Sequence, residues 1–250
     1  MKAALGGPLA AIQFLTRIPV PGARLDGVTL AQAAPSFPLV GALLGLAAGG
    51  IDVLLRSHLS ALAAAGGTVL FLVAITGGLH EDGLADTADG LGGARSPERA
   101  LAIMRDSRIG SYGAIALSFS ILVRCVLIAA LPRQATFAYL IAAETLSRWS
   151  VLPLAYFLPS ARGSGAAAGQ GARLARSLSP AALMAGTVLA VAVTIAALHS
   201  ASALPWVVCL ATCLVSGLYF RRRIGGVTGD CFGATIQLVA AAVYVCGAWR

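Results

Sequence analysis

Charged side chains are scarce in this chain of 250 residues, and lysine is nearly absent. Only 11% of the residues carry a charge, ten residues are acidic, and Lys2 is the single lysine. In contrast, 58% of the residues are apolar, and the mean hydropathy is +0.85. Soluble domains do not have this balance, so the composition indicates an integral membrane protein. The sequence also has no Walker-type glycine loop, which argues against ATP hydrolysis.

CxxC pairs are missing as well, and no cleavable leader is expected. No CxxC pair occurs, so the five cysteines are predicted to be small packing residues and not disulfides or zinc ligands. They are Cys125, Cys209, Cys213, Cys231 and Cys246. The first apolar run is shortened by Gln13 and Arg17, and the RIPVPG sequence that follows is a poor cleavage site. We therefore expect a retained amphipathic or half-inserted helix that ends at Pro19.

Seven apolar stretches are long enough to cross a bilayer as helices, which takes about 20 residues each. They lie near 34–55, 61–79, 113–132, 136–158, 181–198, 203–220 and 232–249. Helices are required because every backbone polar group must be satisfied within lipid. The sequence therefore predicts an all-α fold, a polytopic membrane bundle of about seven transmembrane helices plus the N-terminal helix. Residues 1–250 form a single domain, because the spans leave no room for a soluble one.

Positive charge is distributed unevenly between the two ends of these spans. If the amino end is cytoplasmic, thirteen of the 18 lysines and arginines fall on its side and three on the other, with Arg124 and Arg148 inside spans. Cytoplasmic loops carry such an excess, so this orientation is predicted. The cationic face suits anionic lipid headgroups or a phosphorylated substrate. Nucleic acid is not expected, because the cations lie in separate short loops without interleaved aromatic residues.

Four of the ten acids occur within nine positions of the sequence TGGLHEDGLADTADG, residues 76–90. In a helix, Asp82, Asp86 and Asp89 at i, i+4 and i+7 share one face, and Glu81 points away. Like charges so placed destabilise a helix, whereas a hard divalent cation such as Mg²⁺ takes carboxylate oxygens and leaves positions for substrate phosphates. We favour a metal site over a solvated acidic turn, because acids this close to lipid are usually functional.

The next motif, MRDSRIGSYG at 104–113, has the composition of a phosphate site. Arg105 and Arg108 can donate paired hydrogen bonds to phosphate oxygens, and Asp106 stands between them. The glycine turn at Gly110 opens a helix and presents free backbone N–H groups to an anion. An ordinary helix start is the alternative interpretation of this motif.

Two further stretches are predicted to reach the same site. RRRIGGVTGDCFGA at 221–234 combines a cationic run with Gly229, Asp230 and Gly233. At least two of its three arginines are expected to be topology anchors. Within the fourth span, Arg148 either pairs with Glu144 at i, i+4 or contacts an anionic substrate, and both interpretations stay open.

Five motifs follow one another along the chain: TRIPVP at 16–21, FPLVG at 37–41, GGLHEDGLADTADG at 77–90, IMRDSRIGSYGA at 103–114 and GGVTGDCFGA at 225–234. In sequence and order they closely resemble the cobalamin synthase family, also called adenosylcobinamide-GDP ribazoletransferases. The resemblance extends from near residue 12 to near residue 238. Two features depart from the family: Glu81 stands where an apolar residue is often found, and Gln237 where a carboxylate is common.

The resemblance implies a Mg²⁺-dependent transferase in the cytoplasmic membrane of a prokaryote, with its active site facing the cytoplasm. Such an enzyme joins adenosylcobinamide-GDP to α-ribazole or its 5′-phosphate and releases GMP, completing the nucleotide loop of vitamin B12. Asp82, Asp86, Asp89 and Asp106 become catalytic candidates, and the first three also metal ligands. The predicted substrate-binding residues are Arg105, Arg108, Gly110, Arg148, Gly229, Asp230 and Gly233. The general base stays open between Asp89 and Asp106, and a homo-oligomer is left open.

Two other classes of protein share single features with this sequence. CDP-alcohol phosphotransferases carry DxxDGxxAR followed by GxxxDxxxD; DTADGLGGAR at 86–95 matches the first part with one extra residue, but the second part is missing. An ion-coupled transporter should carry its acids in the middle of spans. Here the acidic cluster lies at a cytoplasmic edge.

Overall fold

The described part of the chain, residues 2–20, 29–162 and 169–249 of this computed structural model, is helical apart from its connections and one isolated parallel bridge between Ser160 and Val227. Arg24 and Arg250, which entered the charge count, lie outside these residues. The helices are α1 (Lys2–Leu15), α2 (Leu30–Ala33), η1 (Ala34–Ser36), α3 (Phe37–Arg56), α4 (Ala61–Thr76), α5 (Leu79–Gly93), α6 (Pro97–Ile103), α7 (Ser111–Ala130), α8 (Arg133–Trp149), α9 (Val151–Phe157), α10 (Gln170–Ser177), α11 (Pro180–Leu198), η2 (His199–Ser202), α12 (Ala203–Ile224) and α13 (Gly229–Ala248).

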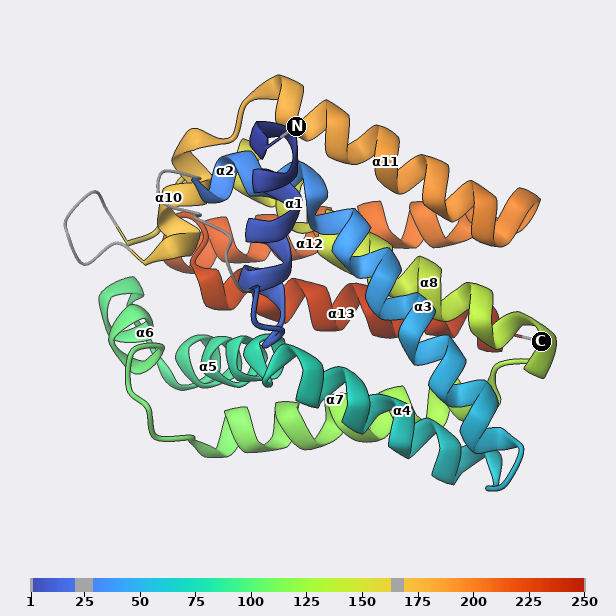
Figure 1. Cartoon of the computed structure of the whole chain (residues 1–250). Helices are drawn as coiled ribbons and strands as arrows, with labels where there is room; N and C mark the ends of the chain where they lie inside the picture. Colours follow the sequence, from blue (N-terminus) through green and yellow to red (C-terminus); the bar gives the residue numbers. More distant parts are fainter. Residues whose placement is uncertain (1, 21–28, 163–168, 250) are drawn as a thin grey trace.

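The long helices run lengthwise in Figure 1, with α13 in the middle of the bundle and α7, α11 and α12 around it. Helix α1 lies across them near one end, and its Phe14 ring stacks on Phe37 of α3 at 5.8 Å between centroids. It ends at Leu15, four residues before the expected end at Pro19. Helices α5 and α6 lie at the end opposite the carboxyl terminus. The bundle thus has two distinct ends, and the acidic sequence belongs to only one of them.

The all-α polytopic architecture is confirmed, but the expected count of seven separate spans is not. Among the residues that the structure describes, four helical segments could cross a membrane by length and hydropathy, 30–56, 111–130, 180–224 and 229–248, or five if α4 and α5 form one broken span. The 45-residue segment holds two of the expected spans, α11 and α12, because His199 breaks it with a positive φ of 52°. The expected span at 136–158 is too short and polar: α8 has 17 residues and contains Glu144 and Arg148.

The acidic sequence forms the helix that its i, i+4, i+7 spacing predicts. This helix, α5, has 15 residues and packs against α7 and α13. Helix α4 ends at Gly77, α5 begins after Gly78, and the two helices meet at 89°. Both glycines have positive φ, 66° and 72°, a conformation that other residues rarely adopt. Helix α5 by itself is neither long enough nor apolar enough to cross a membrane, so it lies outside the spans.

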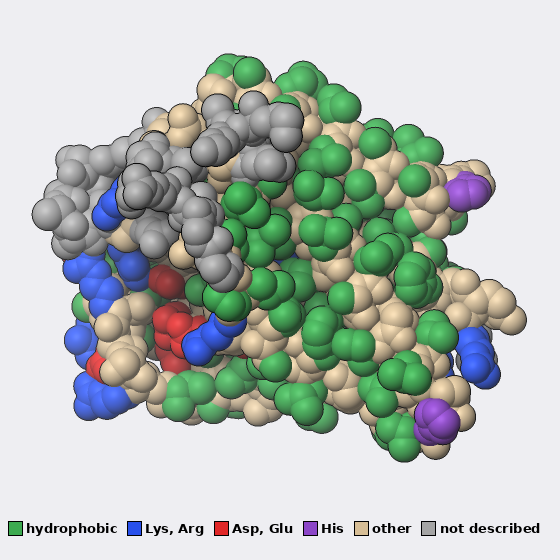
Figure 2. All heavy atoms as spheres, in the orientation of Figure 1, with side chains coloured by type: hydrophobic (Ala, Val, Ile, Leu, Met, Phe, Trp, Pro, Cys, Tyr) green, Lys and Arg blue, Asp and Glu red, His purple; other side chains and the backbone are tan. Residues whose placement is uncertain are grey.

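The two ends of the molecule differ in charge. Figure 2 shows most of the Lys and Arg side chains at the end formed by α5 and α6, around a hollow that contains acidic side chains. Apolar side chains cover the flank of the bundle between the two ends. Many of them are large and exposed, such as Leu70 on α4, Phe119 on α7 and Leu214 on α12. This apolar flank is the surface that a polytopic membrane protein presents to lipid.

Candidate active site

The site begins with a close crossing of α5 and α13 at two glycines. A Cβ on Gly83 would lie 3.0 Å from the carbonyl oxygen of Asp230 and 3.2 Å from the Cα of Gly233. Only glycine allows backbones to approach this closely without displacing one another. The crossing sets the exposed Asp82 of α5 beside the half-buried Asp230 in the first turn of α13. Gly233, predicted to bind substrate, therefore has a packing role that the sequence did not indicate.

Asp86, one turn further along α5, stands among other carboxylates. Partial burial, Asp82 and Asp230 raise the pKa of Asp86 to about 7, with a smaller effect from Asp89, although Arg162 opposes them. A carboxyl group with this pKa is about half protonated at neutral pH, because the cluster holds more negative charge than its surroundings balance. The cluster can accept either a proton or a cation. Asp82, Asp86 and Asp230 form what we call the acidic cluster.

Asp89 has a different environment from the other two predicted ligands. It is 8% exposed, and its oxygens accept hydrogen bonds from the backbone N–H groups of Gly110 at 2.7 Å and Gly113 at 2.8 Å. The carboxylate thus holds the N-terminus of α7, where an anion is favoured by the helix dipole. A Cβ on Gly110 would lie 2.5 Å from Asp89 Oδ1. The glycines of IGSYG therefore bind a carboxylate of the protein itself.

No three acids, histidines or cysteines stand close enough to hold a metal ion by themselves in the part of the chain that the structure describes. The predicted trio of Asp82, Asp86 and Asp89 is therefore not a preformed metal cage, because both oxygens of Asp89 are engaged by α7. Mg²⁺ is usually held by one or two carboxylates together with waters and substrate phosphates. The donors of the acidic cluster fit that kind of site, and the metal role of Asp89 stays a prediction.

Arg162 is a site residue that the sequence did not reveal. Its Nη2 donates to Asp230 Oδ2 at 2.7 Å, and its buried Nε has no partner among the described residues. The isolated bridge positions it: Ala161 N–H donates to the Val227 carbonyl at 3.0 Å, and Val227 N–H donates to the Pro159 carbonyl at 2.9 Å. No local sequence pattern predicts a bridge between Ser160 and Val227, because these residues lie far apart in the sequence.

A cavity of about 340 Å³ opens beside the acidic cluster. Its charged residues are Asp82, Asp230 and Arg162, and the remaining lining is largely apolar and comes mainly from α1, α2, α3, α5, α9, α10 and α13. His80 also lines it; this residue is 3% exposed, and its Nε2 has no hydrogen-bond partner among the described residues. Burial, with the positive charges of Arg148 and Arg124, holds the pKa of His80 well below its ordinary value, so its ring is neutral.

The two positions that depart from the family touch each other in the core. Glu81 is buried and forms an ion pair with Arg124 of α7 at 2.8 Å. The side-chain amide of Gln237 on α13 donates to the same Glu81 oxygen at 3.0 Å, and Ser120 donates to the Gln237 oxygen at 3.2 Å. Glu81 is therefore a structural counter-charge for a buried arginine, in agreement with its exclusion from the predicted metal set.

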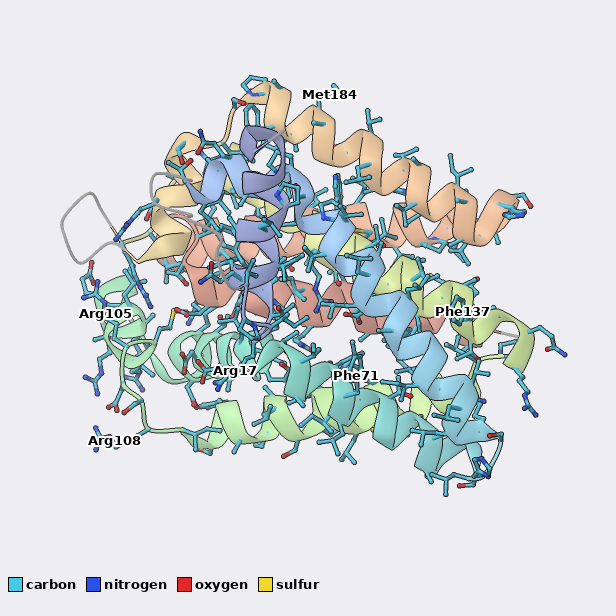
Figure 3. All side chains as sticks on the ribbon, viewed as in Figure 1. Arg17, Phe71, Arg105, Arg108, Phe137 and Met184 are labelled. Atoms are coloured by element: carbon cyan, nitrogen blue, oxygen red, sulfur yellow. The ribbon has the colours of Figure 1, made fainter. Side chains whose placement is uncertain are left out.

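The phosphate motif before α7 lies further out. Arg108 is largely exposed and donates to both oxygens of Asp106, at 3.0 and 3.2 Å from Nε and 2.6 Å from Nη2. Hydrogen bonds from Arg108 lower the pKa of Asp106 to about 2, which makes this carboxylate a weak base. Figure 3 shows Arg105 and Arg108 projecting away from the bundle at the end formed by α5 and α6. Their substrate contacts stay predictions.

Arg148 lies inside the bundle and not at the cavity. It is 3% exposed and pairs with Glu144, whose other oxygen accepts from the Tyr244 hydroxyl at 3.0 Å. Of the two interpretations of Arg148, the structure shows the pairing with Glu144. Gly229 begins α13 beside Gly171 of α10, whose Cβ would come within 2.6 Å of the Gly229 backbone. Close packing therefore accounts for the Gly229 position, which also lines the cavity.

Comparisons with known proteins support one family. The family model described as cobalamin-5-phosphate synthase matches residues 7–248. The adenosylcobinamide-GDP ribazoletransferase of Azorhizobium caulinodans is 47% identical over 92% of this chain and 90% of its own length. The proteins of the same name from Sinorhizobium medicae and Escherichia coli K12 are 42% and 38% identical, covering 93% and 92% of this chain and 92% and 94% of their own. No solved structure matches the chain. The chain belongs to the cobalamin-5-phosphate synthase family.

Proposed function

We propose that this protein is an adenosylcobinamide-GDP ribazoletransferase that performs the last step of cobalamin nucleotide-loop assembly. The observation that carries the proposal is the acidic cluster beside a cavity with a charged edge and apolar walls, in a chain similar over nine-tenths of its length to proteins of that name. A ribose hydroxyl of α-ribazole, or of its 5′-phosphate, attacks the phosphorus bonded to the cobinamide side chain. The bond between that phosphorus and the GMP oxygen breaks, and GMP leaves with the electron pair.

Positioning and charge neutralisation carry most of such a reaction, because the phosphoryl transition state needs little covalent help. Asp82 and Asp86 would hold Mg²⁺ together with the pyrophosphate, and the ion would neutralise negative charge on the leaving GMP. Arg162 can donate its unpartnered Nε to a non-bridging oxygen, since it already lies beside Asp230.

The proton of the attacking hydroxyl needs an acceptor. Neither base predicted from the sequence suits this role: Asp89 accepts two backbone hydrogen bonds, and Arg108 ties up Asp106. Asp230 lines the cavity, and its hydrogen bonds from Arg162 and Thr228 both go to Oδ2, which leaves Oδ1 to accept a proton. We therefore assign the proton to Asp230, from which it passes to water after GMP has left.

We further propose that the charged end of the bundle faces the cytoplasm, in the cytoplasmic membrane. The excess of arginine at this end supports that orientation. Both substrates are large and polar, so a site at the membrane surface receives them without a crossing. Labelling of single introduced cysteines at Arg105 and Arg133 in intact cells and in inverted membranes tests it: only position 105 should require inverted membranes.

The activity is tested with membranes that contain the protein, adenosylcobinamide-GDP, α-ribazole and Mg²⁺. The expected products are cobalamin and GMP in equal amounts, and no product while the Escherichia coli relative is active would overturn the proposal. Release of CMP from a CDP-alcohol would instead support the rival phosphotransferase. Omission of Mg²⁺ in the presence of a chelator should abolish turnover.

The individual roles are separated by substitutions that preserve size. Asp82→Asn and Asp86→Asn should raise the Mg²⁺ concentration needed for activity, whereas Asp230→Asn should lower kcat by about 100-fold or more at saturating Mg²⁺. Glu98→Gln is the matched control, because Glu98 is an exposed acid on the neighbouring α6. Equal behaviour of Asp230→Asn and Glu98→Gln would remove Asp230 from the reaction.

Arg162 has its own matched control. Arg162→Gln should raise the KM for adenosylcobinamide-GDP, because the guanidinium that faces the pyrophosphate is lost. Arg173→Gln removes an exposed arginine from α10 and should leave this KM unchanged. If both substitutions act equally, the effect comes from the general positive field of this end and not from a contact.

A further inference from the structure

The cavity beside the acidic cluster has two chemically different parts. Its charged residues lie together, since Arg162 pairs with Asp230, and the close crossing of α5 and α13 at Gly83 sets Asp82 beside Asp230. The rest of the lining includes aromatic and branched aliphatic side chains. They are Phe14, Leu15, Leu30, Phe37, Val151, Leu174, Phe232 and Ile236. A ligand that fits this cavity therefore has an apolar body and a polar end that reaches the carboxylates.

The volume of the cavity limits the size of that ligand. About 340 Å³ is near the lower end of the range for small-molecule pockets, roughly 300–1,000 Å³. The corrin ring of the cobinamide substrate, with its amide side chains, is too large for such a space. The bicyclic aromatic base of a ribazole nucleoside is flat, largely apolar and small enough to enter.

Two observations on the walls favour an aromatic base in particular. The rings of Phe14 and Phe37, both of which line the cavity, are stacked with an interplanar angle of 12°, a parallel arrangement that a further flat aromatic ring can extend. His80 is 97% buried at the cavity wall, and its Nε2 has no partner among the described residues. Unpartnered buried polar atoms are rare in folded proteins. The free ring nitrogen of a benzimidazole nucleoside is an acceptor that His80 could satisfy by donating from Nε2.

We propose that this cavity is the binding site for the base of the ribazole substrate, held between α1, α2, α9 and α13. The proposal rests on the proposed function. With the base among the apolar residues, the attached ribose emerges at Asp82 and Asp230. The attacking hydroxyl then lies at the acidic cluster, where the pyrophosphate of the second substrate would be held. Cavity residues thus select the nucleoside, and α1 is part of the active site in addition to lying across the bundle.

The test reduces the cavity without touching the acidic cluster. Leu30 of α2 is half-buried at the cavity wall, and Leu30→Trp adds a bicyclic ring there. We expect the KM for α-ribazole to rise about tenfold or more while the KM for adenosylcobinamide-GDP changes less than about twofold. The rise in KM should be smaller for a riboside of unsubstituted benzimidazole than for α-ribazole, whose benzimidazole carries two methyl groups. Leu46→Trp, on the exposed face of α3, is the matched control and should change neither KM.

The outcomes separate this inference from the proposed function. If wild-type protein releases no GMP with both substrates present, the proposed function fails. If wild-type protein is active and Leu30→Trp leaves the KM for α-ribazole unchanged, or raises both KM values equally, the base does not bind here and the inference is overturned. Val151→Ala, which enlarges the cavity, is a second test if Leu30→Trp does not fold. It should raise the ratio of two kcat/KM values: that for a riboside whose base has one more fused ring, divided by that for α-ribazole. No change in that ratio would also overturn the inference.

Discussion

The pKa of Asp86 makes a quantitative prediction about Mg²⁺. This carboxyl group has an ordinary pKa of 3.8, which burial and the neighbouring acids raise to about 7. If Asp86 binds Mg²⁺, the ion competes with a proton at this position. At pH 8 about nine-tenths of the groups are ionised, and at pH 6 only about one in eleven is. The apparent activation constant for Mg²⁺ should therefore rise about tenfold between pH 8 and pH 6.

The measurement is the Mg²⁺ concentration that gives half-maximal GMP release at pH 6, 7 and 8, with both substrates saturating. Asp86→Asn should need about tenfold or more Mg²⁺ at pH 8 and should lose most of the pH dependence, because the titrating ligand is gone. Glu98→Gln should reproduce the wild-type slope. Binding of Mn²⁺ to purified protein gives the same comparison without turnover. It is measured from the electron paramagnetic resonance signal of the Mn²⁺ that stays free.

The reasoning would be refuted if the wild-type activation constant did not change with pH, or if Asp86→Asn kept the wild-type slope. A stability measurement checks the sign independently. Because the folded state holds the proton more tightly than the unfolded chain, this group destabilises the protein without Mg²⁺ as pH rises from 3.8 to about 7, and the effect is complete above 7. Asp86→Asn should therefore raise the thermal unfolding temperature at pH 8 without Mg²⁺, and added Mg²⁺ should narrow the difference.

Two further predictions concern packing around the site. Glu81→Leu leaves Arg124 buried without its counter-charge, which should cost about 3–5 kcal/mol, and adding Gln237→Glu should restore most of the stability because the new carboxylate arises within the same contact. Gly113→Ala places a methyl group against the Asp89 carboxylate and should weaken its hold on the N-terminus of α7, lowering both stability and turnover. Thermal unfolding in detergent measures the first pair of changes, and unfolding together with GMP release measures the second.

Each of these predictions has a control. If Glu81→Leu alone is as stable as the double variant, Glu81 is not the counter-charge of Arg124. For the glycine, Gly50→Ala on α3 is the matched change, because a Cβ there meets nothing within 4 Å. It should leave turnover unchanged. Equal losses in both glycine variants would mean that the effect of Gly113→Ala is not local to Asp89.

The sequence predicted well the features that depend on composition and short spacing. Apolar runs predicted the all-α membrane architecture, although not the number of spans, and the i, i+4, i+7 pattern predicted the helix that carries Asp82, Asp86 and Asp89. What it could not predict is the surroundings of that helix. Asp89 has the same spacing as its neighbours, but it meets the α7 N-terminus, so its oxygens are occupied by Gly110 and Gly113. Spacing gives the face of a helix and does not give what packs on that face.

Long-range contacts account for the other differences. In the sequence, nothing distinguishes Arg162 from the other arginines. The bridge between Ser160 and Val227 is what places it beside Asp230. The expected span over 136–158 looked apolar on average, although its polar residues Glu144 and Arg148 pair inside the bundle. Hydropathy averages the side chains along a segment, whereas burial depends on their partners.

A small rotation at the right-angled joint of Gly77 and Gly78 is amplified along α5. Asp86 stands seven residues beyond Leu79, the first residue of α5, about 10 Å along the helix at 1.5 Å per residue. A rotation of only about 3° at the joint would move its carboxylate by about 0.5 Å, which is the tolerance of a working catalytic geometry. The backbone N–H of Arg17 donates to the Ile75 carbonyl at 2.7 Å, and a Cβ on Gly77 would collide with the Arg17 side chain, so the segment after α1 braces the joint. The position of the proposed metal ligand thus depends on two residues that have no side chains.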